Sequence, residues 1–366
     1  MWHKVGILLL ALFGFSSPDY ANFMAVSDFH FNPYAACTDT MPCPTIEKLR
    51  QADVSQWDAI LRADDKAPIE ANADTNYALL TSTLAELKQR ALQENPSFVI
   101  IDGDYLAHGF KANFLKYSRD ASQDAYQAFV KKTYEFITNE LGTTFPNTSV
   151  YLAIGNNDSY QDDYITIPQG VLFKDLSVIW SSLIKDKNNQ VLMQQAFSMN
   201  GYYAVDAIPK KLRLIVLNSN LLVIKASGEG IDQAANDELT WLQNELDLAA
   251  KNNEKVMIVE HAADTEDVFA SLKKQPVSIV TLYKPVYADR YLAAIKSHAA
   301  IITGILAAHV HMDWFQITTQ SGTPMIVNGL PGISALFGNN PAYKVYDYDE
   351  NTFALQNAQT LSLIHI

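Results

Sequence analysis

Short apolar runs alternate along the chain with longer segments in which apolar residues recur at helical spacing. The runs contain almost no polar residues, which is typical of strands buried on both faces. They fall at residues 23–27, 98–101, 150–154, 212–217, 256–259 and 300–303. Near the C-terminus, three further segments predict strands joined by short turns: 314–319, 324–327 and 343–348.

Two helices are predicted between these strands. One carries Leu80, Leu84, Leu87 and Ala91 on a single face. The other begins near Asp232 and carries Leu239, Leu242, Leu246 and Ala249 at the same spacing. The alternation of strands and helices predicts an α/β protein with two central sheets flanked by helices.

Polar residues stand directly after five of the predicted strands. The five sets are Asp28-Phe29-His30, the segment from Gly103 to His108, Gly155-Asn156-Asn157-Asp158, Glu260-His261 and His309-Val310-His311. One Asp-x-His is also typical of a capped turn, and one His-x-His of two strand residues on the same face. Five sets at strand ends, holding five of the eight histidines, favour a single site at the carboxyl edge of the sheets.

The side chains in these sets have the chemistry of metal ligands. Carboxylate, imidazole and amide groups suit zinc, manganese or iron. Seven candidates are present: Asp28, His30, Asp104, Asn156, His261, His309 and His311. One tetrahedral ion needs fewer, so we expect two divalent ions about 3.5–4 Å apart, bridged by one carboxylate and a hydroxide.

These motifs resemble the calcineurin-like metallophosphoesterase superfamily, whose pattern is D-x-H, G-D, G-N-H-[DE], H and G-H-x-H. The resemblance spans residues 23 to about 350 and implies a four-layer α/β/β/α sandwich with two central mixed β-sheets. It implies that one metal, most often zinc, is held by Asp28, His30 and His311. A second would be held by Asn156, His261 and His309, with Asp104 as the bridge.

Within the superfamily the chain looks most like the acid sphingomyelinase and sphingomyelinase-like phosphodiesterases. The segment from Gly103 to His108 is similar to their G-D-x-x-A-H, two cysteines follow the D-x-H motif, and the run from Asn340 to Tyr346 is also similar. The resemblance implies hydrolysis of phosphodiester or phosphoanhydride bonds in small molecules of nucleotide or phosphocholine type. The nucleophile would be the metal-bridging hydroxide.

The catalytic acid is expected to differ from the family pattern. Asn157 stands where the family has a histidine that contacts substrate or protonates the leaving group, and an amide cannot donate a proton as an acid. We therefore assign the acid role to His108 and expect Asn157 beside it at the catalytic centre. The G-N-N-D form leaves open a phosphomonoesterase or an endopolyphosphatase, and a metal-binding protein without turnover.

The N-terminus predicts export. Lys4 precedes an apolar run at 5–15 and the small residues Ser16 and Ser17, the pattern of a signal peptide, although a buried first strand would look similar. We expect a signal peptide at 1–21 and one domain at 22–366, with a secreted or periplasmic location, or a lysosomal one in a eukaryote. No other segment is apolar for eighteen residues, so no transmembrane segment is predicted.

Cysteine content and charge narrow the picture further. Cys37 and Cys43, the only two cysteines, are expected to form a local disulfide in an exported protein, the alternative being thiolate metal ligands. With 27 basic and 40 acidic residues the net charge is −13, and no Lys/Arg stripe is present. A nucleic-acid groove is therefore not expected, whereas bound metal ions would let an acidic protein bind phosphate.

Overall fold

The computed structural model describes residues 20–265, 271, 280–318 and 325–363. The predicted signal peptide lies almost wholly outside this part of the chain, although Tyr20 and Ala21 already belong to the first strand. The ends of two predicted strands, Thr319 and Pro324, also lie outside it. Among the described residues, none of the helices combines the length and the apolar character needed to cross a membrane.

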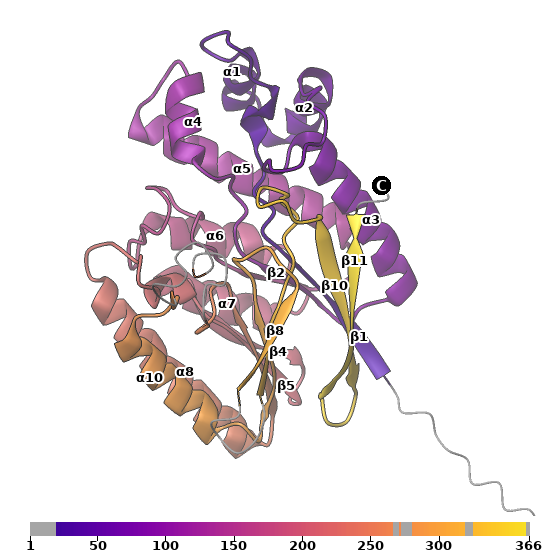
Figure 1. Cartoon of the computed structure of the whole chain (residues 1–366), viewed down its shortest axis with the longest axis vertical. Coiled ribbons are helices and arrows are strands. Elements are labelled where there is room, and N and C mark those ends of the chain that lie inside the picture. The colour runs from indigo at the N-terminus through magenta and orange to yellow at the C-terminus, as the bar shows by residue number, and fades with distance from the viewer. Residues whose placement is uncertain (1–19, 266–270, 272–279, 319–324, 364–366) are drawn as a thin grey trace, which may run out of the picture.

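The strands form two mixed sheets (Figure 1). The five-stranded sheet has the order β11-β10-β1-β2-β3, with β1 parallel to β2 and antiparallel to β10. Its strands are β1 (Tyr20–Ser27), β2 (Val99–Asp102), β3 (Val150–Ala153), β10 (Ala342–Asp349) and β11 (Leu355–Ser362). The six-stranded sheet has the order β4-β5-β6-β7-β9-β8. Its strands are β4 (Tyr203–Ile208), β5 (Leu212–Val216), β6 (Lys255–Glu260), β7 (Ile302–Ala307), β8 (Trp314–Thr318) and β9 (Met325–Gly329).

Helices cover the outer faces of both sheets, so the predicted four-layer sandwich is confirmed (Figure 1). Helices α3 and α5 lie beside the five-stranded sheet, and α8 and α10 beside the six-stranded sheet. The α-helices are α1 (Pro44–Gln51), α2 (Trp57–Asp64), α3 (Tyr77–Glu94), α4 (Phe110–Tyr117), α5 (Gln123–Thr144), α6 (Val171–Ser181), α7 (Lys187–Asn200), α8 (Ile231–Asn252) and α10 (Pro285–Ser297). Short 3₁₀ helices within the described residues are η1 (Pro33–Ala36), η2 (Val54–Gln56) and η3 (Ser219–Leu221).

Strand alternation divides the apolar residues of the six-stranded sheet between two cores. Leu214 and Val216 belong to the core between the sheets, whereas Ile215 and Leu217 pack under α8 and α10. Because successive side chains of a strand point to opposite faces, a run without polar residues fills both cores at once. This burial explains why the central strands could be recognised from composition alone.

Strand β7 corrects one predicted boundary. The apolar run at 300–303 predicted a strand ending before Gly304, but β7 runs from Ile302 to Ala307. Gly304 lies inside the strand, paired with Met257 of β6, and a Cβ there would stand only 3.0 Å from the Leu355 side chain. The glycine therefore marks a close approach to the β11 segment rather than the end of the strand.

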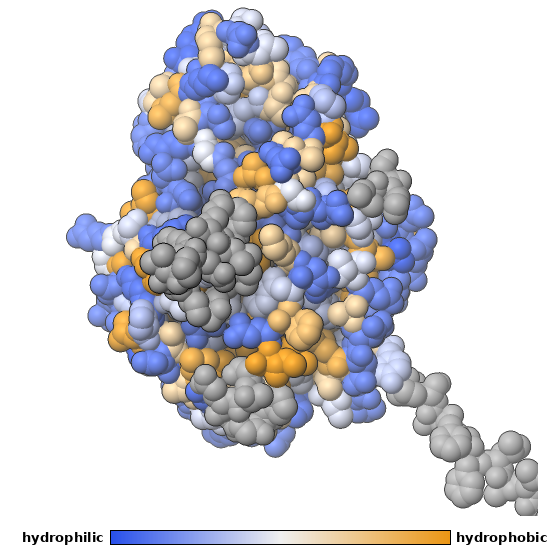
Figure 2. Space-filling view, viewed as in Figure 1, coloured by the Kyte–Doolittle hydropathy of each residue, from blue (hydrophilic) through white to orange (hydrophobic). Residues whose placement is uncertain are grey.

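The face of the molecule seen in Figure 2 is mostly hydrophilic, with a hydrophobic cluster over the region of β8. Phe315 and Ile317 of this strand are exposed.

Cys37 and Cys43 are joined in a disulfide, as predicted. This bond ties the end of η1 to the start of α1.

Candidate metal centre

The strand order brings the predicted polar sets together. Ser27, Asp102 and Ala153 are neighbours across β1, β2 and β3, so the segments that follow these strands leave the sheet side by side. In the other sheet, Glu260 of β6 pairs with Ala307 of β7, and His261 and His309 come just after them. All seven candidate ligands therefore meet at the carboxyl edge where the two sheets face each other.

The loops turn sharply to aim their side chains at one centre. Asp28, His30, Asp104, His309 and His311 have left-handed backbones, with φ between 42° and 71°. This conformation costs non-glycine residues on the order of 1–3 kcal/mol each and persists only where the surroundings enforce it. Such strain at five of seven candidate ligands indicates that the direction in which these side chains must point, and not the lowest backbone energy, determines the conformation of the loops.

Asp104 occupies the middle of the cluster. Its Oδ2 lies 3.3 Å from the Nε2 atom of His30 and 3.2 Å from the Nε2 atom of His261. Ligand atoms of Asp28, His30 and Asp104 form one group within 4.8 Å, and those of Asp104, His261 and His309 form another. Asp104 belongs to both groups, which is the geometry that a bridging carboxylate requires.

His311 completes the half of the site around Asp28. Its Nε2 lies 3.5 Å from Asp28 Oδ1 and 3.1 Å from the Nε2 atom of His30. Three polar side chains that close together, all nearly inaccessible to water, repel one another or compete for protons unless a cation lies between them. The arrangement is therefore suited to a metal ion.

Hydrogen bonds to backbone carbonyls decide which ring nitrogen of each histidine faces the centre. The Nδ1 atoms of His30, His261 and His311 bind the carbonyl oxygens of Leu106, Asp102 and Ser334 at 2.9, 2.8 and 3.2 Å. These contacts leave the Nε2 atoms for a metal. His309 is reversed, because its Nε2 lies 3.2 Å from the Tyr164 hydroxyl and Nδ1 is left for the metal.

Unsatisfied acceptors supply an independent test of whether a metal fits. The amide nitrogen of Asn156 donates to Asp163 Oδ1 at 2.7 Å, which fixes the amide with its oxygen directed away. Within the described part of the chain, neither this Asn156 oxygen nor either Asp28 oxygen finds a hydrogen-bond donor. Buried acceptors without partners cost about 1–3 kcal/mol each, a cost that cations bound to these oxygens would remove. The residues present therefore fit a dinuclear metal site.

The protonation states also suit metal binding. Burial lowers the pKa of His30 to about 4 and that of His309 to about 3, so both rings are neutral ligands at neutral pH. Burial alone would raise the pKa of Asp104, but His261 and His30 hold it well below its ordinary value. Burial would lower the pKa of His261, and Asp104 raises it well above its usual range. A metal at this position would therefore displace a proton from His261.

His108 and Asn157, the predicted catalytic pair, lie in different settings. Asn157 is buried, and its amide nitrogen donates to Asp104 Oδ2 at 3.0 Å while its backbone N–H donates to Oδ1 at 2.8 Å. It thus touches the central carboxylate, and its part in catalysis stays a prediction. The His108 side chain is 32% exposed, and its ring stacks on His30 with centroids 4.0 Å apart. Substrate could therefore reach His108.

Asp158 supports the centre, a role that was not predicted for it from the sequence. Its Oδ2 accepts N–H bonds from Asp104 and Gly155 at 2.8 Å each, and its Oδ1 accepts one from Tyr105 at 2.9 Å. Burial, followed by the nearby charge of Asp104, raises the pKa of Asp158 to about 7. The carboxylate joins the ends of β2 and β3, and its place in the G-N-N-D motif was a signal that could have identified it.

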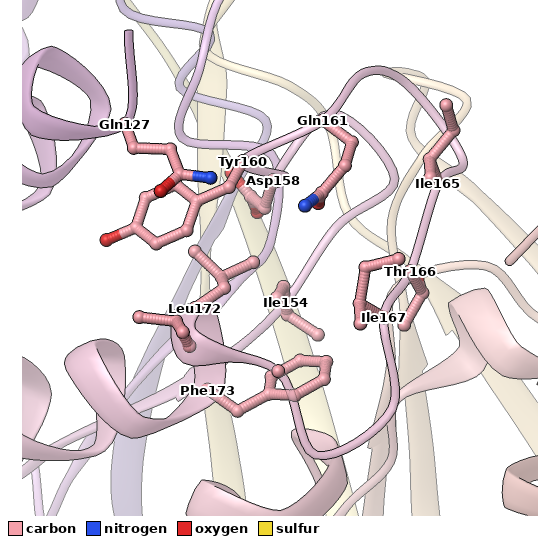
Figure 3. A pocket seen from close by; sticks show the side chains of 12 residues that line it. Gln127, Ile154, Asp158, Tyr160, Gln161, Ile165, Thr166, Ile167, Leu172 and Phe173 are labelled. Carbon is pink, nitrogen blue, oxygen red and sulfur yellow. The ribbon is translucent and has the colours of Figure 1, made fainter. Parts of the chain in front are cut away.

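Asp163 and Tyr164 had no such signal. They sit in a loop without a strand-end motif, and only the folded chain brings them to Asn156 and His309. Residues before and after this segment in the chain line a separate pocket (Figure 3). The pocket is lined by Asp158, Gln127 and Gln161 and by apolar residues such as Leu172 and Phe173, and none of the seven candidate ligands lines it.

Comparisons with known proteins agree with this geometry. A family model described as "Calcineurin-like phosphoesterase" matches residues 21–313. Mouse (Mus musculus) acid sphingomyelinase-like phosphodiesterase 3b is 22% identical over 370 residues, covering 98% of this chain and 74% of that protein. Bovine (Bos taurus) cyclic GMP-AMP phosphodiesterase SMPDL3A is 23% identical over 367 residues, covering 97% and 73%. Sphingomyelinase phosphodiesterase C of Dictyostelium discoideum is 24% identical, covering 77% and 60%.

Because Asp104 belongs to both groups of ligand atoms, its replacement should change the metal content of the protein. We expect elemental analysis of the purified protein to find close to two transition-metal ions per chain. Replacing Asp104 with Asn should lower the occupancy of both positions, because a neutral amide cannot bridge two cations.

Asp237→Asn, on the exposed side of α8, is the matched control and should retain the metal content of the wild type. An Asp104→Asn protein that still holds two ions would contradict the bridging assignment.

Proposed function

The chain belongs to the calcineurin-like phosphoesterase family, and on this premise we propose that it is an exported hydrolase of phosphodiester or phosphoanhydride bonds in small molecules. Family membership makes it a metal-dependent phosphoesterase, as the sequence predicted. The observation that carries the proposal is the pair of ligand groups that share the buried Asp104.

The relatives support the substrate class. Their names describe phosphodiesterases that act on sphingomyelin or on cyclic GMP-AMP, which are a phosphocholine lipid and a nucleotide. We propose that this chain acts on phosphoesters of the same two kinds. Metal ions would provide the positive charge that a protein of net charge −13 otherwise lacks for binding phosphate.

The residues divide into two proposed ligand sets around one bridge. One ion would be held by Asp28, His30 and His311, the other by Asn156, His261 and His309, with Asp104 between them. Zinc is the metal we propose, with manganese and iron as alternatives, because imidazole and carboxylate groups are its usual ligands. When bound, the two ions would polarise the phosphoryl oxygens and lower the pKa of water toward neutrality.

His108 is proposed to protonate the leaving group. Burial would lower its pKa, but hydrogen bonding to Asp74 and the Asp74 charge raise it above the ordinary histidine value. A raised pKa keeps a proton available at neutral pH. The partial exposure of the ring supports the role, since an acid must reach the departing oxygen.

A substrate panel tests the proposed function. We expect hydrolysis of bis-p-nitrophenyl phosphate that is abolished by exhaustive chelation and restored by zinc. Nucleotide and phosphocholine esters should be cleaved faster than phosphomonoesters or polyphosphate. Activity that survives complete metal removal would sink the proposal, faster cleavage of monoesters or polyphosphate would favour the alternative phosphatases, and bound metal without turnover would indicate a non-catalytic protein.

The acid role of His108 predicts a dependence on the leaving group. His108→Ala should lower kcat/KM for an alkyl phosphodiester by about 10²–10⁴, because an alkoxide must be protonated as it departs. Esters of p-nitrophenol should lose much less, since p-nitrophenolate leaves without a proton. Equal losses for both substrates would show that His108 binds the phosphoryl group or orders a ligand instead.

Export predicts a processed and oxidised chain. The disulfide between Cys37 and Cys43 supports an oxidising compartment. Tyr20 and Ala21 pair with Asp349 and Tyr348, so cleavage after Ser16 would leave β1 intact, whereas cleavage after Ala21 would shorten it. Mass spectrometry should find a mature chain that begins between about residues 17 and 23 and lacks two hydrogens. An intact Met1 with free thiols would refute export.

A further inference from the structure

One buried carboxylate outside the seven candidate ligands contacts the site. Asp74 lies between α2 and α3, and its side chain is only 8% exposed. Its Oδ1 lies 3.0 Å from His108 Nδ1, and its Oδ2 accepts the backbone N–H of His108 at 2.9 Å. The hydroxyl of Ser334 also donates to Oδ1, at 2.9 Å.

These contacts fix the direction of the His108 ring. Asp74 holds the backbone and the ring of one residue together, so rotation of the side chain would break the bond to Nδ1. The ring is also confined by its stack on His30 and by the edge of Phe337, whose centroid lies 5.6 Å away. Because Nδ1 is taken by Asp74, Nε2 is the nitrogen left to face the centre.

Asp74 is also tied to the frame that holds the candidate ligands. Ser334, whose hydroxyl donates to Asp74, also contacts a candidate ligand. Its carbonyl oxygen accepts a hydrogen bond from His311 Nδ1 at 3.2 Å. The backbone N–H of Ser334 donates to the carbonyl oxygen of Asp28 at 2.9 Å. The position of the His108 ring is thus set relative to Asp28 and His311 by a continuous chain of hydrogen bonds.

We propose that Asp74 is a positioning residue of the phosphoesterase reaction: its carboxylate accepts the Nδ1–H of His108 and so holds the ring in the orientation in which Nε2, which must carry the donated proton, faces the scissile phosphoryl group. The inference rests on the proposed function, since it requires His108 to act on the leaving group. Asp74 itself touches neither the substrate nor the candidate ligand side chains; it acts through His108.

Asp74→Asn tests the inference with almost no change of side-chain volume. An amide oxygen accepts the Nδ1–H more weakly than a carboxylate, and the amide nitrogen can also turn toward Nδ1, so the ring would be held less firmly with Nε2 toward the phosphoryl group. We expect kcat for an alkyl phosphodiester to fall about 10- to 100-fold, with KM and metal content close to those of the wild type. The kcat for bis-p-nitrophenyl phosphate should change little.

A double-mutant cycle separates positioning from general support. In a His108→Ala background, Asp74→Asn should cause no further loss on the alkyl ester, because both changes remove the same function. Asp64→Asn is the matched control: that carboxylate also accepts hydrogen bonds, but from Thr45 and Lys48, and its loss should leave kcat unchanged. Equal losses on both esters, or additive losses in the cycle, would overturn the inference.

A spectroscopic measurement covers the case in which the variant does not fold. In ¹⁵N-histidine-labelled, zinc-loaded wild type, the His108 ring, identified by its absence from the His108→Ala spectrum, should carry a proton on Nδ1, where Asp74 accepts it. An Nδ1 atom without a proton would overturn the inference. If the wild type cleaves neither ester, the proposed function fails; if His108→Ala shows the selective loss but Asp74→Asn does not, only the Asp74 inference fails.

Discussion

Burial of the Asp104 carboxylate is the constraint on which the rest of the site depends. Its side chain is 2% exposed, and its Oδ2 lies within 3.3 Å of two imidazole nitrogens. A buried charge is tolerated only when partners surround it. Asn157 donates two of the bonds that hold the carboxylate, and Asp158 holds the backbone N–H of Asp104 itself. Gly155 has no side chain because a Cβ there would collide with the Asp104 carboxylate.

The convergence of these side chains strains the backbone of the loops. Hydrogen bonds outside the ligand cluster hold the strained conformations in place. Backbone bonds hold three of the left-handed ligand residues: the N–H of His30 donates to Asp104 O at 2.8 Å, and the carbonyl oxygen of Asp28 accepts the Ser334 N–H at 2.9 Å. The first bond joins the loops after β1 and β2 of the five-stranded sheet, and the second joins the loop after β1 to the segment after β9 of the six-stranded sheet. The geometry of the metal centre therefore depends on how the two sheets pack together. A loop that relaxed to an unstrained backbone would displace a ligand.

Much of this could be predicted from sequence because apolar runs locate the buried strands and polar motifs mark their ends. The convergence of Asp28, Asp104 and His261 follows from that pattern. Strands β4 and β11 were missed, since β11 is largely exposed and its sequence is mostly polar. Asp74 and Tyr164 were missed for another reason: they reach His108 and His309 across 34 and 145 residues, from loops without any motif. Contacts of that kind depend on the finished fold.

The ring-nitrogen assignments show the same limit at atomic scale. A histidine in a motif is identified as a ligand by its residue type, but the nitrogen that it offers depends on what the other nitrogen binds. For His30 and His261 that partner is a backbone carbonyl, which every residue possesses, so no sequence signal marks it. His309 differs only because Tyr164 takes its Nε2. Residue chemistry thus determines which side chains can form the centre, and the loop conformations determine how each one faces it.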